Sequence, residues 1–65
     1  MPPYQQRVIT ERSELLDKTE KLGVFLSGTI FNSVALDEQS RLIKQYAFMK
    51  LYLEILDERI AAWRS

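Results

Sequence analysis

The sequence predicts an all-α protein, a helical hairpin that assembles into a symmetric homo-oligomer. The chain has 65 residues and contains neither cysteine nor histidine, so disulfides and zinc sites built from these ligands cannot support its small core. Residues 46–56 are apolar or aromatic at nine of eleven positions, and a helix there is apolar over roughly 260° of its circumference. Two helices cannot cover such a surface, which favours cover by other subunits.

The first predicted helix covers residues 4–26 of a single domain that spans residues 1–65. Pro2 and Pro3 are compatible with the N-terminus of a helix but not with its interior, so the helix is expected to start near Tyr4. One seam along it repeats at steps of three and four residues, the spacing of a helix face that packs on a neighbour. Its members are Val8, Arg12, Leu15, Thr19, Leu22 and Leu26.

Residues 27–36 form the predicted connector. Ser27, Gly28 and Thr29 are turn residues that end the first helix, and Gly28 suits a left-handed helix cap. The apolar pair Ile30 and Phe31 predicts a short helical turn that folds back and closes one end of the hairpin.

The second predicted helix covers residues 38–64, with Asp37 as its N-cap. Its apolar residues fall on three seams, of which the first helix can cover one. We assign to the first helix the seam of Leu42, Gln45, Met49, Tyr52, Leu56, Arg59 and Trp63. We expect contacts between subunits at Tyr46, Phe48, Leu51, Leu53, Ile55 and Trp63.

Composition limits the possible functions. Nine basic and nine acidic residues give a formal net charge of zero, which argues against duplex DNA or RNA as the main partner. No stretch approaches the ~20 apolar residues of a membrane span, and the N-terminal segment lacks the apolar core of a signal peptide. These features favour a cytoplasmic protein without a membrane partner.

Catalytic chemistry has few candidate residues. Glu54, Asp57 and Glu58 share one helix face and could ligate a divalent cation, although such a trio is more often a solvated acidic surface. No dinucleotide or Walker motif is present. We therefore expect no enzyme, no metal and no cofactor.

Arginines and aromatic rings suggest a binding function instead. Arg12 interrupts an apolar seam, where its guanidinium needs a carboxylate, a phosphate or an aromatic face, and both a structural and a ligand-binding role are open. Rings beside arginines can hold a nucleobase and its phosphate. The candidate ligand contacts are Arg7, Arg12, Lys21, Ser27, Thr29, Arg41, Gln45 and Tyr52.

The sequence resembles a family of small accessory proteins of tailed bacteriophages, labelled by similarity to a crAss-like phage protein. The resemblance covers nearly the whole chain, and Asp57 stands where the family has a small residue. It is carried by the run 11–26, the Leu36-Asp37-Glu38-Gln39 segment, Leu42, Gln45, Met49, Tyr52, Glu54, Ile55-Leu56 and Glu58-Arg59-Ile60-Ala61.

The resemblance implies an accessory protein that acts in the bacterial host cytoplasm. Phage proteins of this size often counter host defences, and the viral sponges among them are symmetric assemblies of helical hairpins that sequester cyclic oligonucleotides or related immune signals without cleaving them. By analogy of shape we expect such a function here. The alternative is an inhibitor or adaptor that binds a host defence protein through its hydrophobic helix.

Overall fold

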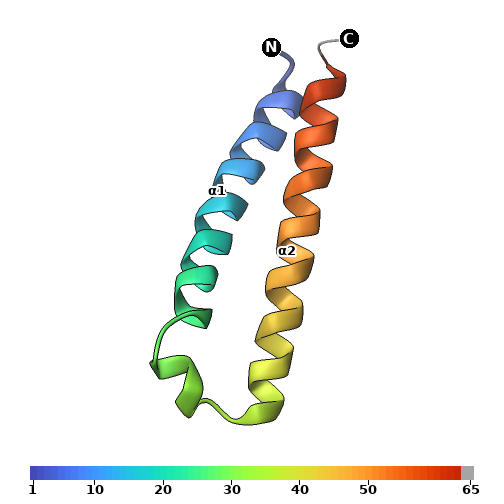
Figure 1. Ribbon diagram of the computed structural model, residues 1–65. Helices are drawn as coiled ribbons and strands as arrows, with labels where there is room; N and C mark the ends of the chain where they lie inside the picture. Colours follow the sequence, from blue (N-terminus) through green and yellow to red (C-terminus); the bar gives the residue numbers. More distant parts are fainter. Residues whose placement is uncertain (64–65) are drawn as a thin grey trace.

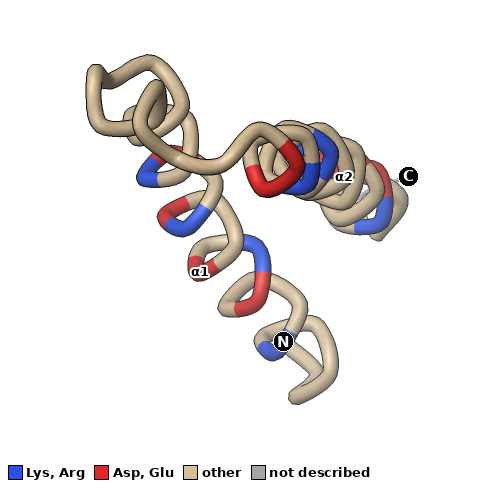
Figure 2. Tube along the Cα trace, turned by 90° about the horizontal axis from the view of Figure 1, so that it is seen from below, with Lys and Arg blue, Asp and Glu red and all other residues tan. Residues whose placement is uncertain are grey.

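Two long helices joined by a short connector make up the fold in the computed structural model, which describes residues 1–63 (Figure 1). Helix α1 spans Pro3–Leu26, the 3-10 helix η1 spans Ile30–Ser33, and α2 spans Leu36–Ala62. The long helices run antiparallel and pack on each other, so the chain is an all-α hairpin as predicted. Viewed from below, their axes lean in different directions, and the helices therefore cross (Figure 2).

The start of α1 follows from the two prolines. Pro2 is extended and serves as N-cap, while Pro3 occupies the first helical position, where its missing N–H is no loss. The Pro2 carbonyl accepts hydrogen bonds from the backbone N–H groups of Gln5 and Gln6, at 3.0 and 3.3 Å. The helix thus begins one residue before the predicted start.

The end of α1 differs from the prediction in its cap. Ser27 is the C-cap in right-handed conformation, and its hydroxyl donates to the Gly23 and Val24 carbonyls at 3.2 and 3.0 Å. Gly28 does not adopt a positive φ, so the predicted left-handed cap is wrong. The Gly23 carbonyl also accepts the Ser27 backbone N–H at 3.2 Å. The serine hydroxyl thus adds hydrogen bonds to carbonyls of the last turn, and the helix ends without a left-handed residue.

The connector folds back on both helices. Phe31 of η1 meets Phe25 of α1 edge to face, with ring centroids 6.1 Å apart. From the first turns of α2, the Gln39 amide donates to the carbonyls of Phe31 and Val34, at 3.1 and 2.8 Å. Ile30 stays exposed. The predicted helical turn is present, and one ring contact and one side-chain amide hold it in place.

Helix α2 begins at Leu36, two residues before the predicted start. Ala35 is its N-cap and makes no side-chain cap bond. The prediction of Asp37 as N-cap is therefore wrong. Asp37 lies in the first turn with Glu38, where two negative charges suit the positive end of the helix dipole. The predicted end at Arg64 lies outside the described residues.

One stripe of each helix forms the core. On α1 the predicted seam is the observed one, with Val8 and Thr19 buried and the other members half-buried. The buried Thr19 hydroxyl donates to the Leu15 carbonyl at 2.6 Å, so it is satisfied without a partner on α2. On α2, Leu56 is 0% exposed. The half-buried or buried residues of the α2 stripe are Leu42, Tyr46, Met49, Leu53, Leu56, Ile60 and Trp63.

This α2 stripe corrects the predicted assignment of faces. Gln45, Tyr52 and Arg59 are exposed, whereas their neighbours Tyr46, Leu53 and Ile60 are half-buried. Both sets continue the same three-four spacing, and the apolar set faces α1 because that burial is the more favourable. Tyr46 and Leu53, which we expected at contacts between subunits, therefore belong to the stripe that packs within the chain.

Gly23 explains how α1 accommodates the ring of Tyr46. A Cβ atom at this position would lie 3.0 Å from the Tyr46 hydroxyl oxygen. The glycine therefore gives the ring space against the α1 backbone. At the far end of the hairpin Trp63 meets Tyr4 edge to face at 6.1 Å, so this predicted subunit contact also packs within the chain.

Replacing the most buried side chain tests the position of the core. We expect Leu56→Ala to lower the free energy of unfolding by about 2–5 kcal/mol, because it removes apolar contacts and leaves a cavity. Leu36→Ala is the matched control, since Leu36 is 79% exposed, and it should change that free energy by less than about 0.5 kcal/mol. Urea denaturation followed by circular dichroism at one protein concentration measures both. Equal effects would contradict this core.

Gly28 provides a second test, of the helix cap. With no positive φ at Gly28 and the nearest atom to a new Cβ 3.5 Å away, Gly28→Ala should stabilise the protein by about 0.4–1 kcal/mol through a less flexible unfolded chain. The same urea experiment measures it. A left-handed glycine would instead make the substitution destabilising.

Candidate functional site

The hairpin has two sides, which its interhelix contacts define. Arg12 of α1 lies opposite Asp57 of α2, and Gly23 of α1 lies opposite Tyr46 of α2. Gly23 is eleven residues after Arg12, and Tyr46 is eleven residues before Asp57, as expected for antiparallel helices. These two pairs lie on the same side of the α1–α2 contact. Helical spacing of 100° per residue then assigns every other side chain to this ion-pair side, to the opposite side or to an outer face.

Arg12 and Asp57 join the two helices on the ion-pair side. The Arg12 Nε group donates to Asp57 Oδ1 in a direct ion pair. This hydrogen bond and the negative charge of Asp57 raise the pKa of Arg12 above its ordinary value. Of the two roles left open for Arg12, the structure shows the structural one. Asp57, where the resembled family has a small residue, supplies the partner.

Two arginines without carboxylate partners mark the open end of the hairpin, on the opposite side. Arg7 follows Tyr4 by one turn of α1, and Arg59 precedes Trp63 by one turn of α2. Because Tyr4 and Trp63 are in contact, the two arginines are roughly level. Both are exposed, and within residues 1–63 neither forms an ion pair. We call Tyr4, Arg7, Arg59 and Trp63 the open-end cluster.

Three other candidates share one edge of α2. Arg41, Gln45 and Tyr52 lie within about 40° of one another on the helix, on the same side as Arg7 and Arg59. Gln45 is exposed, and its amide donates only a long contact of 3.8 Å to the Met49 sulfur. Arg59 lies on this edge as well. The edge thus combines guanidinium groups, an amide and an aromatic ring, which can bind phosphate, hydroxyl groups and a flat base.

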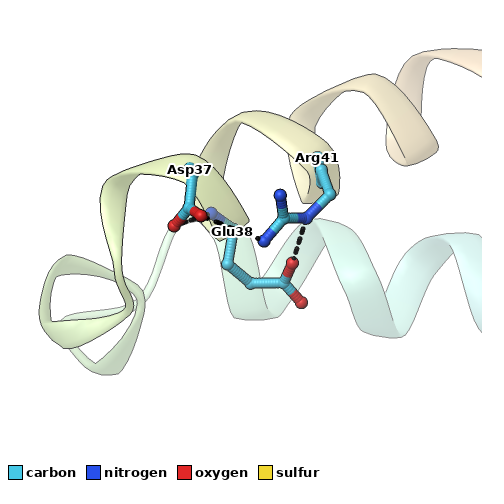
Figure 3. Close-up of polar contacts among 3 residues, drawn as sticks. All are labelled: Asp37, Glu38 and Arg41. Atoms are coloured by element: carbon cyan, nitrogen blue, oxygen red, sulfur yellow. Dashed lines mark hydrogen bonds and ion pairs between the residues drawn. The ribbon is translucent and has the colours of Figure 1, made fainter.

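Arg41 is the cation of this edge that already has partners. Its Nε group donates to Glu38 at 2.7 Å, and its terminal nitrogen lies 3.4 Å from an Asp37 oxygen (Figure 3). The hydrogen bond to Glu38 is the main cause that raises the pKa of Arg41. An anion at Arg41 must therefore compete with two carboxylates, whereas Arg7 and Arg59 form no ion pair within residues 1–63.

The remaining candidates do not join this group. Lys21 faces outward on α1 and pairs with Asp17 at 2.9 Å; the bond to Asp17 raises its pKa. Ser27 and Thr29 lie at the connector, twenty or more residues beyond Arg7, which is ~30 Å along a helix. Figure 2 shows an uncharged connector and charges of both signs that alternate along α1. One chain does not bring all predicted ligand contacts together.

The candidate ligands for a metal ion are Glu54, Asp57 and Glu58. Residues 1–63 contain no group of three or more acidic, histidine or cysteine side chains placed to hold a metal ion. Glu54, Asp57 and Glu58 share a helix face only in part, and Asp57 is paired with Arg12. The described part of the chain also forms no enclosed pocket. Neither helix, as far as it is described, has an apolar stretch long enough to span a membrane.

Comparison with known proteins identifies the family. Residues 2–62 match the model of a family called Sequestin. The chain belongs to the Sequestin family. It is also 39% identical over 64 residues to the "Uncharacterized 7.5 kDa protein in denB-rIIB intergenic region" of Enterobacteria phage T4, covering 98% of this chain and 100% of that protein. No solved structure matches the chain.

These matches support the small phage protein family that the sequence analysis predicted, and the name Sequestin suggests sequestration. The similarity to a crAss-like phage protein stays an expectation. Sequence reasoning did not select Tyr4 and Arg59 as ligand contacts. The signal that could have found them is the antiparallel pairing of the helices, which places the first aromatic residue of this Sequestin beside its last and one arginine beside each.

The Arg12–Asp57 ion pair can be tested by exchanging its charges. Arg12→Asp and Asp57→Arg should each lower the urea midpoint of unfolding, because each places like charges together between the helices. The double variant should recover most of the loss. Raising the salt concentration to about 1 M should reduce all three effects, since the Debye length falls to about 3 Å. A double variant no better than the single ones would contradict a direct pair.

Proposed function

We propose that this Sequestin is a phage counter-defence protein that sequesters a nucleotide immune signal of the bacterial host, such as a cyclic oligonucleotide or a related molecule, without cleaving it. The family membership carries this proposal, because the family name suggests sequestration. The phage T4 relative, matched along its whole length, supports the phage setting. The protein acts as a symmetric homo-oligomer in the host cytoplasm.

The open-end cluster supports a nucleotide as the ligand. Arg7 and Arg59 offer guanidinium groups that form no ion pair within the described residues, and two such forks can bind phosphate by charge-assisted hydrogen bonds. Tyr4 and Trp63 present an aromatic pair one helical turn from these arginines, and a base can stack on such a ring with a gain of about 1–3 kcal/mol. The chemistry of the cluster therefore fits a phosphate and a base together.

Sequestration requires only binding, and the local chemistry agrees with that. A host signal is neutralised when its free concentration falls, so the protein must be abundant and bind tightly, and it needs no turnover. Arginine and aromatic side chains bind and orient a nucleotide. The bound molecule is released unchanged when the protein unfolds.

Calorimetry tests this proposal. The panel consists of cyclic dinucleotides, cyclic trinucleotides and ADP-ribose derivatives, and we expect saturable binding of at least one compound. Arg7→Ala and Arg59→Ala should each weaken it at least tenfold, about the loss of one charged hydrogen bond. Lys21→Ala is the matched control, since Lys21 lies on the outer face and is paired with Asp17; it should leave the affinity unchanged.

A second measurement tests the absence of cleavage. After binding, the protein is denatured by heat, and the mass of the released compound is measured by mass spectrometry. We expect the intact mass of the added nucleotide. Hydrolysed product would make the protein an enzyme, and no binding to any compound would overturn sequestration of nucleotides.

A further inference from the structure

A second apolar stripe of α2 faces away from α1. Its centre consists of Phe48, Leu51 and Ile55, which are 69%, 52% and 51% exposed. Their spacing of three and four residues is that of a helix face in contact with another helix. The stripe lies roughly 80° to 140° around α2 from Leu56, the centre of the contact with α1. Helix α2 thus carries two packing faces, and the chain covers one of them.

The exposed area has the size of one half of an interface. The chain exposes 5007 Å², whereas a compact monomer of 7.7 kDa exposes about 4,300 Å². The difference of about 700 Å² is close to the ~800 Å² that each partner of a standard interface buries. A second chain packed on this stripe would therefore lower the accessible surface of each chain to about that of a compact monomer of this mass.

Charges at the two ends of the stripe distinguish the possible partners. Lys44 lies seven residues before Leu51, and Glu58 lies seven residues after it. Two helical turns, ~10.5 Å, separate each charge from Leu51. Both side chains point out on or beside the stripe, and neither forms an ion pair within residues 1–63. The stripe is therefore apolar at its centre, positive at one end and negative at the other.

We infer that a second copy of this chain packs on the stripe, with the two α2 helices antiparallel and a two-fold axis at Leu51. This arrangement sets each Lys44 opposite Glu58 of the second copy. It also places Phe48 opposite residue 54 of the second copy, next to that copy's Ile55. The apolar centres of the two stripes therefore pack against each other. Parallel helices would instead place Lys44 against Lys44 and Glu58 against Glu58, which is repulsive.

The same two-fold axis would complete the candidate ligand site. This part of the inference rests on the proposed function. The edge of α2 that carries Arg41, Gln45, Tyr52 and Arg59 borders the stripe. A two-fold axis perpendicular to both helices brings the edges of the two copies to the same side. Arg59 of one copy is then level with residue 43 of the other, between Arg41 and Gln45. Each dimer would carry one groove with two equivalent sites, each lined by both chains.

Charge reversal tests the arrangement independently of any nucleotide. Sedimentation equilibrium of the full chain should show a dimer. Lys44→Glu and Glu58→Lys should each raise its dissociation constant about tenfold or more, because each turns two attractive pairs into two repulsive ones. The double variant should return the constant to within a few-fold of the original. Lys50→Glu is the matched control, since Lys50 lies on the polar side of α2, and it should leave the dimer intact.

The outcomes separate this inference from the proposed function. Single reversals without effect, a monomer at all concentrations, or an odd-numbered assembly would overturn the antiparallel dimer. Circular dichroism of each variant shows whether it still folds, and the double variant serves where a single one does not. A dimer with the expected charge response that binds no nucleotide would retain the inference and overturn only sequestration. A nucleotide-binding monomer would do the reverse.

Discussion

Two helices in a hairpin can cover only one face of each other, and this constraint governs the rest of the structure. Within residues 1–63 the buried side chains are Val8, Thr19 and Leu56. The other apolar residues of the contact are half-buried at best. A core this thin is close to the lower limit for a domain that folds alone, particularly without disulfides or metal. The exposed stripe of α2 is the direct consequence.

Three specific contacts fix the register of the two helices, although they bury little surface. Arg12 pairs with Asp57 across the helices, and Gly23 admits the ring of Tyr46. Each of these contacts exists in only one register, whereas leucines on a three-four spacing pack almost equally well when a helix slides by one heptad. The ion pair, the glycine and the ring pair of Tyr4 with Trp63 therefore define which residues are level, and hence that Arg7 and Arg59 lie at similar heights along the hairpin.

The sequence predicted the helices and the α1 seam because periodicity and turn residues are local signals. It did not predict which of two seams of α2 faces α1, since both share Leu42, Met49, Leu56 and Trp63 and differ only at the positions between. The choice depends on α1, where Gly23 has space for a ring. For the same reason the sequence did not point to Tyr4 and Arg59 as candidate ligand contacts, because the contact of Tyr4 with Trp63, which makes Arg7 and Arg59 roughly level, arises only from the pairing of the helices.

The distribution of ion pairs explains how a chain of zero net charge can still attract an anion. Arg12, Lys21 and Arg41 each have a carboxylate partner, so their fields are largely cancelled nearby. Within residues 1–63 Arg7 and Arg59 form no ion pair, and both lie toward the open end of the hairpin. A small ligand responds to the potential over a few ångströms, because salt screens more distant charges beyond about 8 Å. Guanidinium groups that form no ion pair within residues 1–63, and not the total charge, therefore decide whether a small anion can bind, and a long duplex that averages over the whole surface gains little from two of them.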